Sequence, residues 1–204
     1  MDSNKAQLEA EASQILKQFN ETISNIRINS CFSEVVQLFV ECKGKIVTTG
    51  MGKAGIAMRK FTSTLCSLGF PSVYLHPGEA SHGDLGLILG DDILFIASTS
   101  GKTREVMEIM DLARAIDVKT IIGVTSHPDS PIRDRADFVL DMGVIKEAGH
   151  LGLAPTSSIL VMLALTDAVA LVAAKAKGLT REQYGKYHHG GYLGAQARRD
   201  SRIY

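Results

Sequence analysis

The sequence has no excess of charge of either sign and little cysteine. Its 204 residues carry 22 basic and 22 acidic side chains, so it offers no electrostatic reason to bind nucleic acid or an anionic membrane. The three cysteines, Cys31, Cys42 and Cys66, form no C-x-x-C pair. We therefore expect buried thiols in a reducing cytosol, and neither a disulfide framework nor a zinc site built on cysteine.

We expect neither a secretory leader nor a membrane span. The first five residues lack the apolar segment of a signal peptide. The most apolar stretch, residues 159–174, contains Asp167 and is shorter than the about 20 residues that cross a bilayer. We expect a cytoplasmic protein in which this stretch forms a buried core or interface helix.

Short apolar runs alternate with helical patterns along most of the chain. This alternation predicts an α/β fold with a mostly parallel, five-stranded sheet and right-handed crossovers. The length suits one domain, which we divide into N-terminal helices (1–42), an α/β core (43–178) and a C-terminal segment (179–204). The predicted strands lie at 46–49, 72–76, 93–97, 119–125 and 138–141, and the predicted helices at 3–27, 33–41, 54–68, 103–116, 155–178 and 180–187, with a short helix beginning at 130–133 and a polar loop with one short helical turn at 77–91.

Small hydroxyl residues follow the third predicted strand, in the order Ser98-Thr99-Ser100-Gly101-Lys102-Thr103. A strand ends there and a helix begins, so free backbone N–H groups and the positive helix end favour an anion. Capping by Thr103 or Ser100 is the alternative, but four hydroxyls around a glycine exceed what a cap needs. The loop is not a Walker A motif, because Ile96 stands where that motif has glycine. We interpret it as a phosphate-binding loop.

A glycine pattern, Gly50-x-Gly52-x-x-Gly55, follows the first predicted strand. It matches the dinucleotide-binding fingerprint, but the acid expected after the second strand is replaced by Leu-His-Pro at 75–77. The pattern therefore favours a tight backbone turn beside a smaller ligand. Lys53 opposes the dipole of the helix that it begins, which favours a role toward a ligand over that of a solvated lysine.

Further polar side chains lie in loops at the predicted carboxyl edge of the sheet. Residues 76–84 contain two histidines and two acids, which suit a metal ion, although their spacing matches no standard zinc motif. Glu105, in the first turn of a helix, can simply complement the helix dipole. Glu147 lies in a loop of small residues, where function concentrates. His188 precedes two glycines, the alternative being an exposed histidine near the end of the chain.

Together these motifs resemble the sugar isomerase (SIS) domain family and, within it, the arabinose-5-phosphate isomerases of Kdo and capsule biosynthesis. The resemblance implies a flavodoxin-like three-layer sandwich and the interconversion of D-ribulose 5-phosphate and D-arabinose 5-phosphate through a cis-enediol, feeding lipopolysaccharide or capsule synthesis. The matching stretches are 49–55, 76–86, 98–101, 146–148, 151–158, His188, 190–191 and 193–194.

By the same resemblance, the family's important lysine, two glutamates and histidine fall on Lys53, Glu105, Glu147 and His188. Moving a proton between neighbouring carbons needs a base, a group that shuttles hydroxyl protons, and positive charge beside the oxyanion. We interpret Glu147 or His188 as the base, Lys53 as the oxyanion partner and Glu105 as orienting Lys53 or a hydroxyl; a carboxylate base would benefit from a raised pKa. The expected substrate contacts are Gly52, His76, His82, Ser98, Thr99, Ser100, Lys102, Thr103, Thr156, Ser157 and His189.

The resemblance implies no required cofactor, with zinc as an inhibitor or bound ion contacted by His76. Members commonly add a pair of CBS domains, and this sequence ends at Tyr204 without one. We therefore expect feedback by a product such as CMP-Kdo to act at the SIS site itself. Lys102 and His189 depart from the family pattern and could serve an extra anionic group.

SIS domains usually assemble, and we expect a homotetramer in which His188 reaches a neighbour's site. Two alternatives stay open. One is a non-catalytic phosphosugar regulator, which could dispense with Lys53, Glu147 and His188, and the presence of all three favours an enzyme. The other is an isomerase of a different ketose phosphate.

Overall fold

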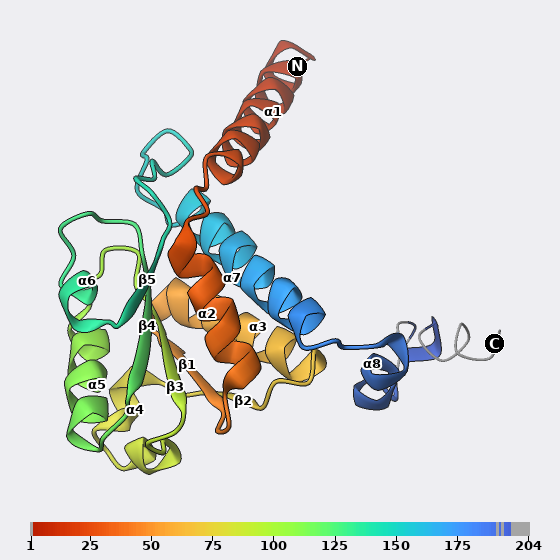
Figure 1. Ribbon diagram of the computed structural model, residues 1–204. Helices are drawn as coiled ribbons and strands as arrows, with labels where there is room; N and C mark the ends of the chain where they lie inside the picture. Colours follow the sequence, from red (N-terminus) through yellow and green to blue (C-terminus); the bar gives the residue numbers. More distant parts are fainter. Residues whose placement is uncertain (1, 191, 193, 197–204) are drawn as a thin grey trace.

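A parallel sheet forms the centre of the molecule (Figure 1). The structure, a computed structural model, describes residues 2–190, 192 and 194–196. The strands are β1 (Ile46–Gly50), β2 (Ser72–Tyr74), β3 (Ile93–Ala97), β4 (Thr120–Thr125) and β5 (Phe138–Asp141), in the order β2-β1-β3-β4-β5. This order is flavodoxin-like, and it places the topological switch between β1 and β3, where such sheets bind ligands.

Helices cover both faces of the sheet, so the predicted three-layer sandwich is confirmed. Alternate residues of each strand face opposite layers: Phe95 and Ala97 of β3 pack on one side, and Leu94 and Ile96 on the other. The first layer contains α2 (Ser30–Glu41), α3 (Gly52–Ser67) and α7 (Ser157–Ala176); the second contains α4 (Pro77–Ala80), the 3-10 helix η1 (Asp84–Leu87), α5 (Arg104–Ala115) and α6 (Ile132–Arg135).

Buried aromatic rings hold the first layer to the sheet. Phe39 of α2, Phe61 of α3 and Phe95 of β3 contact one another with ring centroids 4.9 to 6.2 Å apart. Rings at such distances, in stacked, tilted or edge orientations, stabilise a core beyond the area that they bury. Because α3 is fixed against β3 in this way, the start of α3 and the loop after β3 are held in a set relation.

The apolar stretch near the C-terminus lies within α7, a helix of 20 residues that is two residues shorter at each end than the predicted helix 155–178. By length and composition alone it is able to cross a membrane. In the structure it packs against α2 and α3, and the carboxylate of Asp167 forms an ion pair with Lys60 of α3. These contacts agree with the expectation of a core helix, while Leu171 and Val172 lie on its exposed side.

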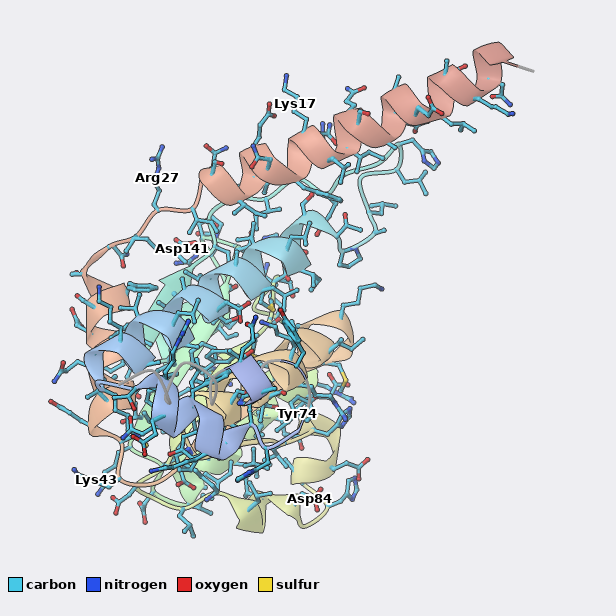
Figure 2. All side chains as sticks on the ribbon, turned by 90° about the vertical axis from the view of Figure 1, so that its right-hand side faces the viewer. Lys17, Arg27, Lys43, Tyr74, Asp84 and Asp141 are labelled. Carbon is cyan, nitrogen blue, oxygen red and sulfur yellow. The ribbon has the colours of Figure 1, made fainter. Side chains whose placement is uncertain are left out.

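The first helix, α1 (Asp2–Ser24), extends away from the rest of the molecule (Figures 1 and 2). It contacts α7, and Ile23 packs against the core, but Leu8 and Leu16 are exposed. In Figure 2, Lys17 and Arg27 point outward from this helix and the segment that follows it.

The last described helix, α8 (Arg181–Tyr187), begins with a capping box between Thr180 and Gln183. It lies at the far end of α3, where the ring of Tyr187 faces Gly69.

The expectation of buried thiols is wrong for Cys66, which is exposed on α3, and only half met by Cys31 and Cys42, which are partly buried. An apolar neighbourhood in the sequence does not fix which side of a helix a residue occupies. Partial burial raises the pKa of the Cys31 and Cys42 thiols, since the thiolate is poorly solvated there.

Candidate active site

The hydroxyl-rich loop joins β3 to α5 and is held closed by its own side chains. The hydroxyls of Ser98 and Thr103 lie 2.9 Å apart, and the Ser98 hydroxyl also accepts the N–H of Gly101 at 3.1 Å. Thr103 is the N-cap residue of α5, but its side chain makes no capping hydrogen bond. The Ser100 hydroxyl accepts the N–H of Lys102 at 3.3 Å. The capping alternative therefore fails, and these hydroxyls shape the loop.

Gly101 lets this loop lie directly against the segment after β4. Its φ is +62°, and a Cβ at this position would come within 2.3 Å of Cβ of Ser130. The loop is also bonded to that segment, because the carbonyl of Thr99 accepts the N–H of Ser126 at 3.0 Å and the hydroxyl of Thr125 at 3.3 Å. The loops after β3 and β4 thus form one rigid unit.

A cavity of about 320 Å³ lies beside the loop, at the carboxyl edge of the sheet. Residues in or next to the first turns of α3, α5 and α7 border it, so three helix N-termini supply partial positive charge. The N–H groups of Thr99, Ser100 and Thr103 find no acceptor in the described part of the chain and are available to an anion. The lining residues are Met51, Lys53, Ala54, Ala97, Ser98, Thr99, Ser100, Thr103, His127, Pro155 and Ile159.

The glycine pattern after β1 brings α3 close to its strand. A Cβ on Gly55 would lie 2.4 Å from the carbonyl oxygen of Gly50, which also accepts the Tyr74 hydroxyl at 2.7 Å. Gly52 begins the helix at φ +60°. This tight turn places the exposed side chain of Lys53 in the cavity wall, with Gly52 beside it.

The loop at 76–84 stands next to the cavity and contributes none of its lining. His76 is half-buried at the start of α4, and its Nδ1 is buried without a hydrogen-bond partner among the described residues. A Cβ on Gly78 would touch both the His76 ring and the methyl group of Met51, so His76 lies just behind the wall. His82 and Asp84 are exposed. No three His, Cys, Asp or Glu side chains in the described ranges gather closely enough to hold a metal ion.

Glu147 binds the beginning of α7. Its Oε2 accepts the N–H of Thr156 at 2.8 Å and that of Ser158 at 3.3 Å, with the Thr156 hydroxyl at 3.4 Å. Burial alone would raise the pKa of Glu147, but the donors of Ser158, Thr156 and Ser157 outweigh it and hold the pKa below its usual value. The raised pKa that would help a carboxylate base is therefore not found, since these donors favour the charged form.

The comparisons with known proteins agree on one family. The family model of the SIS domain matches residues 38–172. The chain belongs to the SIS domain family. Its fold superimposes on the crystal structure of a Bacteroides fragilis NCTC 9343 protein, proposed to be a phosphosugar isomerase involved in capsule formation, with a TM-score of 0.87 and 40% identity, covering 91% of this chain and 99% of that one.

Two further relatives are similar to this SIS domain over most of its length. The structure of Escherichia coli CFT073 c3406 in complex with arabinose 5-phosphate is similar with a TM-score of 0.85 and 32% identity, over 90% of this chain and 98% of that one. The arabinose 5-phosphate isomerase KdsD of Pseudomonas aeruginosa PAO1 is 42% identical over 168 residues, which are 82% of this chain and 51% of that protein. The chain thus spans about half the length of the curated relatives that it matches.

In this SIS domain, Glu105 and Lys102 flank Thr103 without lining the cavity. Glu105 is half-buried in the first turn of α5, with its carboxylate 3.7 Å from the Arg104 guanidinium, and Lys102 is exposed. Thr156 and Ser157 lie between the lining residues Pro155 and Ile159, and the buried Ser157 hydroxyl has no partner in the described ranges.

The SIS domain does not bring His188 to the cavity of its own chain. The His188 ring stacks on Tyr184 with centroids 4.1 Å apart, and α8 lies at the end of α3 opposite Lys53. Since α3 has 16 residues, that end is about 24 Å from its start. His189 is exposed in the same segment, and the remainder of the predicted C-terminal segment lies partly outside the described residues.

Sequence reasoning missed one polar residue of the cavity wall, His127. It follows β4 almost directly, as the phosphate-binding loop follows β3. The rule that ligands gather beyond the carboxyl ends of parallel strands was therefore sufficient to single it out.

Proposed function

We propose that this SIS domain is an aldose–ketose isomerase that interconverts D-arabinose 5-phosphate and D-ribulose 5-phosphate. The observation that carries the proposal is the cavity itself, which joins an anion-binding loop to an ammonium group, Lys53, within one wall. A similar chain, c3406, binds arabinose 5-phosphate, and the KdsD relatives are named for this reaction. The product would feed Kdo synthesis for lipopolysaccharide or capsule.

The proposed reaction passes through a cis-enediol. The loop 98–103 holds the phosphoryl end of the sugar, and Lys53 stabilises the oxyanion that develops when a proton leaves the neighbouring carbon. Of the two candidate bases, the low pKa of Glu147 supports His188, delivered by a neighbouring subunit, with Glu147 positioning the start of α7. Glu105 would orient Lys53 or a sugar hydroxyl.

The test is incubation of the purified chain with a panel of five- and six-carbon ketose phosphates. We expect aldose formation from ribulose 5-phosphate, its loss in Lys53→Met, and solvent deuterium in recovered substrate. Binding without conversion would instead identify a phosphosugar regulator. Conversion of a hexulose phosphate in preference to ribulose 5-phosphate would assign the enzyme to another substrate.

We extend the proposal to the location, assembly, ligands and regulation of the enzyme. We expect a cytoplasmic homotetramer that comprises N-terminal helices, α/β core and C-terminal segment, and that needs no cofactor. Zinc would act as an inhibitor or bound ion beside His76, whose Nδ1, unpartnered among the described residues, supports such a contact. Competition between CMP-Kdo and substrate in an inhibition assay would support feedback at the SIS site, and its absence at millimolar concentration would remove that idea.

A further inference from the structure

His127 lines the cavity from the loop that follows β4. This strand neighbours β3 on the side opposite to β1. Lys53, which follows β1, and His127 therefore flank the phosphate-binding loop from its two sides. They are also the two titratable side chains among the residues that line the cavity.

The backbone that carries His127 is fixed to the phosphate-binding loop. Its carbonyl accepts Nε of Arg133 at 2.7 Å, and the same guanidinium pairs with Asp141 at 3.0 Å. The preceding residue, Ser126, donates its N–H to Thr99 at 3.0 Å and its hydroxyl to the carbonyl of Gly143 at 2.6 Å. These bonds fix the backbone at His127 relative to the phosphate-binding loop, so the point from which the imidazole extends toward the cavity is set.

The exposed imidazole itself makes no hydrogen bond within the described ranges. An imidazole carries at least one N–H in either protonation state, so it has a donor to offer a ligand. A hydrogen bond from such a donor to a phosphate oxygen is charge-assisted and stronger than one between neutral groups.

We propose that His127 binds the phosphoryl group of the substrate and so leaves the ammonium of Lys53 to the carbonyl end. The division of roles rests on the proposed function, because it requires a sugar phosphate that is anionic at one end and reactive at the other. His127 comes from a loop bonded to the phosphate-binding loop, while Lys53 comes from the turn after β1. Binding of the substrate, more than its turnover, then depends on His127.

Steady-state kinetics with ribulose 5-phosphate test the proposal. His127→Ala should raise KM about tenfold and raise the inhibition constant of inorganic phosphate by a similar factor, with kcat within about twofold. His127→Lys keeps a donor and should recover most of the loss. Asp129→Ala is the matched control, since Asp129 is exposed in the same loop and outside the cavity wall. Unchanged KM and phosphate inhibition in His127→Ala, or a fall in kcat alone, would overturn the proposal.

Calorimetry separates this proposal from that of the reaction. If the unaltered chain fails to isomerise ribulose 5-phosphate, titration with inorganic phosphate and with arabinose 5-phosphate still reports on His127. Binding that is weaker in His127→Ala, at an unfolding midpoint equal to that of Asp129→Ala, supports the role; equal binding in both variants refutes it.

Discussion

At the scale of single residues, the loop after β3 shows how a glycine and two hydroxyls prepare an anion site. The sequence predicts the loop and its chemistry, since small hydroxyl residues follow an apolar run. It does not predict that the Ser98 and Thr103 hydroxyls are occupied with each other, because that pairing depends on the path of the loop. The N–H groups of Thr99, Ser100 and Thr103 are consequently the donors left for a phosphate.

Among the residues of this loop, Gly101 should tolerate substitution least. Gly101→Ala should lower the free energy of unfolding by about 1–3 kcal/mol, because a Cβ meets Ser130 and the backbone stays at positive φ. It should also raise KM, since the loops after β3 and β4 must separate. Urea unfolding and steady-state kinetics measure the two effects.

Gly143→Ala is the control for backbone strain alone, because Gly143 has φ +74° and a Cβ added there would meet no described atom within 4 Å. If Gly101→Ala were no more destabilising than Gly143→Ala, close packing against Ser130 would not be the constraint on this loop.

At the scale of elements, strands with strong apolar runs agree with their predicted bounds closely, and the weak ones do not. β3 and β5 occupy the predicted residues, whereas β2 is shorter than predicted and the loop at 77–91 contains both α4 and η1. Helices of a single turn carry no full period of apolar residues, so tertiary contacts decide them. The contact between Glu147 and the start of α7 is equally hard to predict from the sequence, because Thr156 lies nine positions after Glu147.

Glu147 should stabilise α7 in a pH-dependent way. Its folded-state pKa is lowered, so its contribution is present above the unfolded pKa of about 4.3 and is lost as the pH falls through the folded value. Glu147→Gln should therefore lower the free energy of unfolding at pH 7, by about 1 kcal/mol for a lost helix cap. The difference from the unaltered chain should shrink below about pH 4.

Urea unfolding at several pH values measures this difference, with Glu108→Gln on the exposed side of α5 as the control. A difference that stayed constant down to about pH 3 would show that the charge of Glu147 is not what stabilises α7.

At the scale of the whole molecule, Lys53 and His188 of one chain lie too far apart to act in the same site. One chain places them toward opposite ends of α3, so a site that uses both must draw them from different copies. The sequence alone does not reveal that the segment carrying His188 lies at the end of α3 opposite Lys53. That is why the sequence predicts the residue types of the site more fully than their arrangement.

Mixing two inactive variants tests whether subunits share the site. Lys53→Met and His188→Ala should each be inactive as pure assemblies. Co-expressed, they should regain up to about a quarter of the activity, because some sites then combine Lys53 of one copy with His188 of another. Hybrid assemblies, verified by mass, that stayed inactive would place the role of His188 within its own chain or remove it.

Asp167, which pairs with Lys60 in the folded structure, also has a consequence for the chain before it folds. By length and composition, the segment that forms α7 is apolar enough to enter a lipid bilayer. The Asp167 carboxylate near its middle adds about 2.5–3.5 kcal/mol to the free energy of insertion. After folding, Lys60 neutralises that carboxylate on α3. One acidic side chain thereby makes insertion of α7 into a bilayer less favourable and, in the folded chain, links α7 to α3.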